Sequence, residues 1–377
     1  MKLLYITQMY PSKELPQYCI FLHLQVKALM SRGVDITVVI PATEGESRET
    51  EYDGVKVIYL NYRDYSRSAL YGLVSSQLHK ELKKFTDVSE YDAVFAVHAA
   101  ANILWFDLCL ARKANKPLIV NYRGNNIFEE YKKEPKAFLS NPVKVREEVV
   151  KGSSLSIGVS GVTVNVIKER FPDAPVAVVH NGVDSALFSS ESQESRPGEL
   201  HILCAANLIP IKGHKYLFDA VKSLCERFPD IKLITDVVGR GPYENELKKY
   251  IEDNDIPNVI FHGYVHHDKV AQFMKDTDIF VLPSIFEAFG NVVLEAMACK
   301  KPVVIFKGQG MDDYVTDGVN GMAAKTGDTA DLTAKLELLI KDPELRKTLA
   351  ENARETARKL TWDASAVSMI RAIEGVL

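Results

Sequence analysis

The stretch that decides the fold of this chain is residues 283–298, which read PSIFEAFGNVVLEAMA. It follows an apolar, strand-like run at residues 279–282 and leads into a helical pattern at residues 291–299. In parallel α/β sheets, ligands bind in the crevice at the carboxyl ends of the strands. We therefore expect a strand–loop–helix unit that places Glu287 beside a ligand crevice.

The residues around the predicted helix start suit a ligand with anionic and hydroxyl groups. Gly290 allows the backbone to come close to a ligand, and the amides from Asn291 onward lie at a helix N-terminus, where anions bind. Glu295 follows one turn later and is expected to reach the same crevice. Two carboxylates cannot hold a diphosphate, but they suit sugar hydroxyls. The alternative is that Glu287 caps the helix and that Glu295 is a surface residue.

Strand-like and helical patterns alternate outward from this stretch along nearly the whole chain. The strand candidates lie at residues 3–6, 35–40, 55–60, 93–97, 118–121, 155–159, 176–179, 200–205, 232–238, 259–261, 279–282 and 302–305. The helical patterns lie at residues 21–31, 102–114, 161–170, 214–227, 243–254, 268–275, 291–299, 343–359 and 363–376. Continuous apolar strands that alternate with helices predict an α/β fold of doubly wound parallel sheets.

Two such domains are expected on either side of a polar, breaker-rich segment at residues 189–198. The length of 377 residues also exceeds that of one ordinary domain. We place the first domain at residues 1–185 together with a tail at residues 362–377, and the second domain at residues 186–361. The C-terminal helix in the tail is expected to cross back to the first domain, with Trp362 as its anchor.

Composition excludes several classes of protein. Apolar residues make up 46% of the chain and charged residues 25%, with a net charge of −4. This is a globular balance, unlike that of a disordered chain, a collagen, a coiled coil or a dedicated nucleic-acid binder. No apolar run reaches the roughly 18 residues of a membrane helix, and the first residues turn polar too soon for a secretory signal. Five scattered cysteines without a C-x-x-C pair indicate reduced thiols in a cytoplasmic protein.

Basic residues cluster in one part of the first half of the chain. They are Lys132, Lys133, Lys136, Lys144, Arg146 and Lys151. One interpretation is a solvated face. The other is a patch that meets an anionic acceptor or the membrane surface.

The spacing Glu-x-Phe-Gly-x4-Glu, formed by Glu287, Phe289, Gly290 and Glu295, resembles that of the retaining glycosyltransferases of family four. Further stretches resemble landmarks of this family in the same order, at residues 158–160, 181–184 with 188, 212–213, 239–242, 277–278, 318–321 and 361–362. The resemblance covers nearly the full length and is more specific in the second half. It implies the GT-B fold, in which two Rossmann-like domains face each other across a cleft.

The resemblance also implies roles for individual residues. Glu287 would contact hydroxyls of the donor sugar, and Glu295 would hold the ribose hydroxyls of the nucleotide. Lys212 would neutralise the diphosphate leaving group, where electrostatic stabilisation matters most; taken alone, it is a solvated lysine at a helix-entry turn. The remaining contacts to the nucleotide sugar would come from Asn207, Gly239, Arg240, Phe289, Gly290, Asn291 and Val292. The glycine turn at residues 239–242 would let a base or ribose approach.

Three positions depart from the family pattern. The phosphate loop has Asn207 where many relatives carry arginine, which leaves Lys212 as the main cation. Residues 123–126 read RGNN where many relatives carry His-Gly-x-Asp, so Arg123 would contact a phosphate or an acceptor, or else form a structural ion pair. The first loop has no glycine at residues 17–21, which disfavours its close approach to the donor.

Histidines give weaker signals. His98 follows the strand at residues 93–97 and is either an acid–base candidate or a capping and packing residue. His266 and His267 do not predict zinc, because only Asp268 stands at ligand spacing. No Asp-x-Asp motif is present, so protein groups, and not a required metal cofactor, are expected to neutralise the diphosphate.

Together these features predict a glycosyltransferase that moves a sugar from a nucleoside-diphosphate sugar, such as a UDP- or GDP-sugar, with retention of configuration. The acceptor would be a glycan or a lipid-linked glycan in cell-surface polysaccharide synthesis, reached from the cytoplasm with a peripheral contact at the inner membrane face. The alternatives are a sugar-nucleotide epimerase on the same fold and a catalytically weakened sugar-nucleotide binding protein. A dehydrogenase is disfavoured, because no G-x-G-x-x-G follows the first strand.

Overall fold

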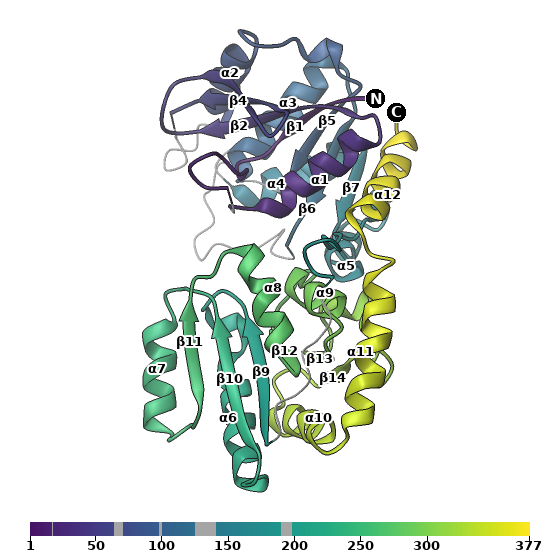
Figure 1. The fold of residues 1–377 in the computed structure, drawn as a ribbon. Helices are drawn as coiled ribbons and strands as arrows, with labels where there is room; N and C mark the ends of the chain where they lie inside the picture. The colour runs from purple at the N-terminus through teal and green to yellow at the C-terminus, as the bar shows by residue number, and fades with distance from the viewer. Residues whose placement is uncertain (17, 64–70, 98–99, 125–140, 190–197) are drawn as a thin grey trace. The chain divides into compact units, whose positions relative to one another are not determined.

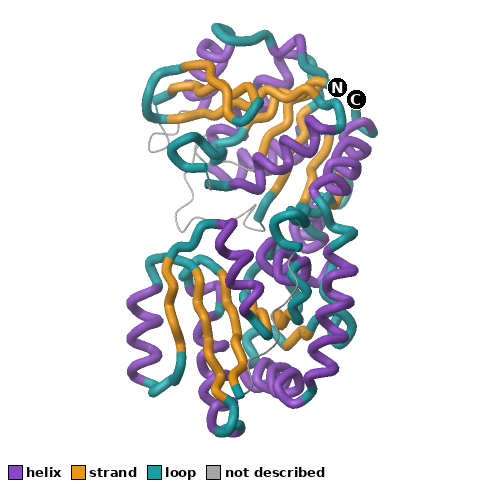
Figure 2. The backbone as a smooth tube through the Cα atoms, in the orientation of Figure 1, coloured by secondary structure: helices purple, strands orange, loops and turns teal. Residues whose placement is uncertain are grey.

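A computed structural model describes residues 1–16, 18–63, 71–97, 100–124, 141–189 and 198–377. The chain divides into two compact units, one formed by residues 1–181 with 362–377 and the other by residues 182–361. Each unit has a sheet with helices packed on it (Figures 1 and 2). The α/β fold of two Rossmann-like units that the sequence predicts is therefore confirmed, and the chain passes between the units after residue 181.

The first unit is built on an eight-stranded sheet in the order β3-β4-β2-β1-β5-β6-β7-β8. Its strands are β1 (Lys2–Ile6), β2 (Asp35–Ala42), β3 (Arg48–Tyr52), β4 (Val55–Asn61), β5 (Ala93–Val97), β6 (Leu118–Tyr122), β7 (Leu155–Gly158) and β8 (Val176–Val178). All neighbours pair in parallel except β3, which runs antiparallel to β4. Strand β3 was not predicted from the sequence, because its residues are polar and mostly exposed and so carry no apolar signal.

Helices cover both faces of this sheet. They are α1 (Ile20–Ser31), α2 (Tyr71–Leu82), α3 (Ala101–Ala114), α4 (Pro142–Gly152), α5 (Gly161–Arg170) and α12 (Trp362–Glu374). Leu4 of β1 belongs to the apolar core shared with α2, α3 and α4, whereas Tyr5 belongs to the core shared with α1 and α12. Alternate residues of a strand thus feed opposite cores, and each fully buried large apolar side chain contributes about 1.5–3 kcal/mol. The final helix α12 packs on α1, and Trp362 is buried at its start.

The second unit has a six-stranded parallel sheet in the order β11-β10-β9-β12-β13-β14. Its strands are β9 (Glu199–Ala205), β10 (Lys232–Val238), β11 (Val259–Gly263), β12 (Ile279–Leu282), β13 (Val303–Phe306) and β14 (Met322–Ala324). Its helices are α6 (His214–Arg227), α7 (Glu244–Asp253), α8 (His267–Asp276), α9 (Asn291–Ala298), α10 (Thr329–Lys341) and α11 (Pro343–Ala357). The strand order reverses between β9 and β12, and a ligand crevice is expected at the carboxyl ends of these two strands.

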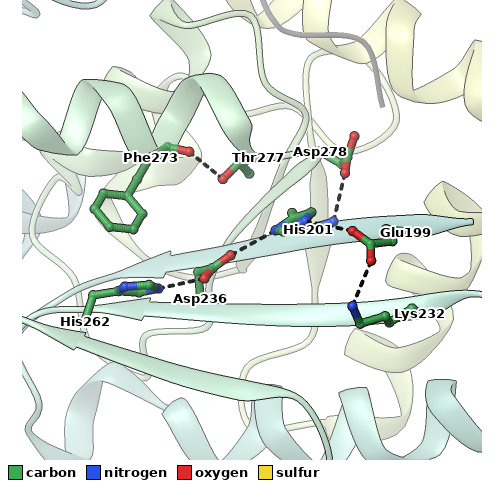
Figure 3. A network of polar contacts seen from close by, with 8 residues as sticks. All are labelled: Glu199, His201, Lys232, Asp236, His262, Phe273, Thr277 and Asp278. Carbon is green, nitrogen blue, oxygen red and sulfur yellow. Dashed lines mark hydrogen bonds and ion pairs between the residues drawn. The ribbon is translucent and has the colours of Figure 1, made fainter. Parts of the chain in front are cut away.

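A polar network joins the neighbouring strands β9, β10 and β11 of this sheet (Figure 3). Asp236 of β10 accepts from His201 of β9 at 3.2 Å and from His262 of β11 at 2.7 Å. Asp278 accepts the backbone N–H of His201 at 2.8 Å, and the Thr277 hydroxyl donates to the Phe273 carbonyl of α8. The family landmark at residues 277–278 therefore has a structural role, because it joins the end of α8 to the sheet.

Candidate functional site

Two loops meet at the carboxyl ends of β9 and β12. The backbone N–H of Ile285 donates to the carbonyl of Ile211 at 2.8 Å, which links the loop after β12 to the loop after β9. Gly213 has a φ of 72°, and a Cβ atom there would lie 1.9 Å from the carbonyl oxygen of Pro283. Only glycine fits this contact, so the Lys212-Gly213 pair seen in the sequence holds the two loops in register.

Lys212 and Glu287 come from these two loops and form an ion pair. Nζ of Lys212 lies 2.5 Å from Oε2 of Glu287, and the side chains are 17% and 15% exposed. Behind the pair, His214 is buried, and burial followed by the charge of Lys212 lowers its pKa to about 4. The structure thus brings together two of the predicted donor-site residues, Lys212 and Glu287. Glu287 does not cap α9, because Gly290 occupies the N-cap position.

A segment after β13 holds the Glu287 loop by its main chain. The N–H of Glu287 donates to Oε1 of Gln309 at 3.0 Å, and its carbonyl accepts from the N–H of Gly310 at 2.9 Å. The buried Tyr314 hydroxyl reaches the carbonyls of Phe289 and Gly290 at 2.7 and 2.9 Å. Burial raises the pKa of Tyr314 well above its ordinary value, so the hydroxyl remains a donor. These supporting contacts were not predicted from the sequence, since they depend on tertiary structure.

Gly290 and the residues after it begin α9. Gly290 has a φ of 76°, and a Cβ atom there would lie 2.8 Å from Sδ of Met311. The glycine is therefore required by backbone conformation and packing, which is a different reason from the ligand approach inferred from the sequence. No side chain caps the helix at Gly290. Asn291 and Val292 lie half-buried in its first turn.

Glu295 is a buried residue of α9, only 8% exposed, so the alternative that it is a surface residue is wrong. Its Oε1 lies 2.9 Å from Nε2 of His267, and its Oε2 is buried without a partner among the described residues. Burial lowers the pKa of His267, but the hydrogen bond and charge of Glu295 outweigh this and leave the pKa raised. Neither the pairing nor a role for His267 was predicted.

The loops after β9 and β10 also touch. A Cβ atom on Gly239, whose φ is 142°, would lie 1.9 Å from the carbonyl oxygen of Ala206. The N–H of Leu208 donates to the carbonyl of Arg240 at 3.0 Å. The glycine turn at residues 239–242 thus serves loop packing, where the sequence suggested approach of a base or ribose. Asn207 and Arg240 are exposed at this edge.

Arg123 follows β6 in the first unit and is held by neutral groups. Its guanidinium donates to Oδ1 of Asn181 and, at 2.5 Å, to Oε1 of Gln25, and it lies 5.6 Å from the ring centre of Phe21. Burial lowers its pKa, with a smaller opposing effect from Tyr5. No carboxylate pairs with it in the described part of the chain, so the structural ion pair is not found. His98 and residues 125–126 lie outside the described residues.

The predicted basic cluster is only partly described. Lys132, Lys133 and Lys136 lie outside the described residues. Of the others, which belong to α4, Arg146 is only 7% exposed, and Lys151 forms an i,i+3 pair with Glu148 at 3.1 Å. The interpretation of the cluster as an entirely solvated face is therefore wrong at Arg146.

The described residues contain no group of three or more His, Cys, Asp or Glu side chains arranged to hold a metal ion. Their helices include none that is long and apolar enough to cross a membrane.

Two family models match adjacent parts of the chain. The model described as Glycosyltransferase Family 4 matches residues 20–187, and the model described as Glycosyl transferases group 1 matches residues 187–356. The chain is 26% identical over 355 residues to an uncharacterized glycosyltransferase of Methanocaldococcus jannaschii, covering 93% of each. It is 30% identical to a D-inositol 3-phosphate glycosyltransferase of Paenarthrobacter aurescens over 54% of this chain and 53% of that one.

Solved structures share the fold at lower identity. Sucrose-phosphate synthase from Thermosynechococcus elongatus superposes with a TM-score of 0.79 at 17% identity, covering 99% of this chain and 98% of that chain. Anabaena HepE in complex with UDP and glucose superposes with a TM-score of 0.76 at 21% identity, covering 100% of both. At these identities the similarity is evidence for the fold and not for a particular substrate.

Proposed function

The chain belongs to the glycosyltransferases that the Glycosyltransferase Family 4 and Glycosyl transferases group 1 models describe, since these models match residues 20–187 and 187–356, and we propose that it transfers a sugar from a nucleoside-diphosphate sugar to a glycan or lipid-linked acceptor with retention of configuration. The observation that carries this proposal is the Lys212–Glu287 pair at the carboxyl ends of β9 and β12. One cation and one carboxylate stand there side by side, next to the start of α9. This combination matches a diphosphate attached to a hydroxyl-rich sugar.

Lys212 would balance the charge that grows on the leaving diphosphate. Glu287 pairs with Lys212 and balances its charge within the protein. When a donor binds, its phosphate would contact Lys212 and weaken the ion pair with Glu287. Sugar hydroxyls would then donate hydrogen bonds to Glu287 and replace part of that ion pair. A fixed cation in a partly buried site acts more strongly than in water, because the local dielectric constant is lower.

The nucleotide would extend along the same edge. Glu295 offers a buried carboxylate oxygen without a partner among the described residues, which suits a ribose hydroxyl. Amides of Phe289, Gly290, Asn291 and Val292 would meet the sugar and phosphates. Structures of the similar Anabaena HepE contain UDP and UDP-glucose, which supports a nucleoside-diphosphate donor here.

Retention would follow from attack on the same face of the sugar, helped by the donor phosphate. Glu287 is a poor nucleophile, because it is held by Lys212 at 2.5 Å. Arg123, with its charge unpaired in the described chain, would face an anionic part of the acceptor or a phosphate. We further propose that no metal is required and that the enzyme works in the cytoplasm, with a peripheral contact at the inner membrane face.

The test is a thermal-shift screen of UDP-, GDP- and ADP-sugars, followed by mass spectrometry of products with lipid-linked and glycan acceptors. One donor should raise the melting temperature, and its sugar should appear on an acceptor with the anomeric configuration unchanged. If an epimerised sugar and free nucleotide form without any acceptor, the protein is a sugar-nucleotide epimerase and not a transferase. Failure of every nucleotide to bind would overturn the proposal.

A further inference from the structure

His267 and Glu295 form a pair that the family motif does not include. His267 is the first residue of α8, and Glu295 lies within α9. Nε2 of His267 is 2.9 Å from Oε1 of Glu295, and the side chains are 24% and 10% exposed. The ring of Phe188 packs edge-on against His267 with centroids 5.1 Å apart. Both members of the pair are therefore fixed by packing as well as by the hydrogen bond.

The pair leaves one carboxylate oxygen without a partner. Oε2 of Glu295 is buried and makes no hydrogen bond to any described residue. A buried carboxylate oxygen without a hydrogen bond is unfavourable, so Oε2 is suited to accept one from a ligand hydroxyl or a water. Since His267 takes Oε1, the position of Oε2 is fixed before any ligand arrives.

The charges around His267 keep the hydrogen bond strong. Burial opposes the protonated imidazole, but the carboxylates of Glu295, Asp184 and Asp268 together outweigh burial and raise the pKa of His267. A hydrogen bond between charged groups is roughly twice as strong as a neutral one. His267 therefore restrains Glu295 more firmly than a neutral donor would.

We propose that His267 is a positioning residue that turns Glu295 so that Oε2 accepts the ribose hydroxyls of a nucleoside diphosphate. This inference rests on the proposed donor site and adds to it a residue that determines discrimination for ribose. The imidazole itself does not touch the nucleotide. Loss of His267 would let Glu295 rotate, and the protein would then no longer distinguish a ribose from a sugar without hydroxyls.

The experiment compares two ligands on each variant. The ligand is whichever of UDP, GDP and ADP gives the largest thermal shift, paired with its 2′,3′-dideoxy analogue. Isothermal titration at pH 6.5 gives the ratio of the two dissociation constants. We expect the wild type to prefer the ribose form by roughly 10-fold or more. His267→Phe should reduce the ratio to about 2-fold, with little change for the dideoxy ligand, because its phosphate contacts remain.

Three controls make the result specific. His267→Gln keeps an N–H donor near the position of Nε2 and should retain most of the ratio, whereas His267→Asn is shorter and should not. His266→Phe changes the exposed neighbour and should behave as wild type. If His267→Phe does not fold, the comparison of Gln with Asn decides alone.

The outcomes separate the two proposals. A wild-type ratio in both His267→Phe and His267→Asn would overturn the positioning role. A wild-type ratio in Glu295→Ala would instead overturn the ribose role of Glu295, and with it this part of the donor site. If no nucleoside diphosphate binds the wild type, the proposed function and the positioning role both fail.

Discussion

The carboxyl edges of the two sheets carry opposite arrangements of charge. In the second unit, Lys212 pairs with Glu287 and His267 pairs with Glu295, so the charges of these four side chains are matched within a few ångströms. In the first unit, the guanidinium of Arg123 is held by neutral amide oxygens, without an ion pair among the described residues. The same fold thus supports a self-neutralised edge and an edge with an unmatched cation. Removing a charge should therefore have different consequences in the two units.

The largest effect is expected at the matched edge. Lys212→Ala removes a charge-assisted contact to the diphosphate and leaves Glu287 unpaired, so transfer should slow by roughly 10- to 150-fold and nucleoside-diphosphate affinity should fall. Steady-state kinetics and calorimetry measure both. Lys248→Ala, which breaks an exposed pair with Glu244, is the matched control and should change neither. An unchanged rate in Lys212→Ala would remove this lysine from the donor site.

The unmatched edge is tested by Arg123→Met. Transfer should fall by about tenfold if an anionic group of a substrate completes the site. The melting temperature should move by no more than about 2 °C, because no buried carboxylate in the described chain loses its partner. A large drop in melting temperature with unchanged transfer by the folded fraction would show that Arg123 has only a structural role.

The two carboxylates of the matched edge, Glu287 and Glu295, should differ in their effects on nucleotide binding and on sugar transfer. Glu295→Ala is expected to weaken binding of the bare nucleoside diphosphate by about tenfold, because the ribose is present in that ligand. Glu287→Ala should spare this binding and damage sugar transfer. Calorimetry with nucleoside diphosphate alone decides, and equal losses in both variants would contradict the division of roles.

A smaller effect, on stability, is expected for Asp107 in α3. Asp107 is a buried carboxylate of the first unit, to be compared with the buried Glu295 of the second. It is fully buried, and neither oxygen has a partner among the described residues. Burial raises the pKa of Asp107 well above 3.8, so the folded state keeps the proton longer than the unfolded chain does. Its contribution to stability therefore declines as pH rises above about 4.

Asp107→Asn should remove this pH dependence and gain about 1–3 kcal/mol relative to wild type at pH 8, with little gain at pH 4. Urea unfolding at the two pH values measures the difference. Asp87→Asn is the control, because it changes an exposed carboxylate that caps a short helix and leaves Asp107 in place. Equal effects of Asp107→Asn at both pH values would mean that burial does not control this carboxyl group.

The smallest expected effect is that of chelation. If Lys212 and the start of α9 neutralise the diphosphate, transfer should survive EDTA. Rates measured before and after chelation, and after adding magnesium or manganese, test this. If EDTA abolishes transfer and either metal restores it, the protein groups of the matched edge do not neutralise the diphosphate without a metal ion.

Local patterns explain what could be predicted from the sequence. The parallel strands are continuous apolar runs, and the stretch at residues 283–298 contains both its own turn and its helix start. Glu287 and Glu295 could therefore be singled out, with Lys212 added by the family resemblance. The polar strand β3, the short strand β14 and the helices α2, α4 and α10 were not individually predicted.

The remaining features depend on residues that are distant in the chain. Tyr314 supports the loop at Phe289 from 25 residues away, and His267 restrains Glu295 from 28 residues away. No local period encodes such contacts, since they exist only after the sheet has formed. The glycines at positions 239 and 290 show the same limit, because their partners, Ala206 and Met311, are known only from the fold.

The return of α12 to the first unit has a consequence for how the protein is made. Ala366, Met369 and Ile373 complete an apolar core whose other members, such as Leu3 and Leu22, are near the start of the chain. A ribosome adds about 5–20 residues per second, so these early residues are synthesised roughly 17–70 s before α12. During that interval the surface of α1 that α12 will cover is open to water and to other nascent chains. The second unit is in effect an insertion into the first, and the first unit is the last to be finished.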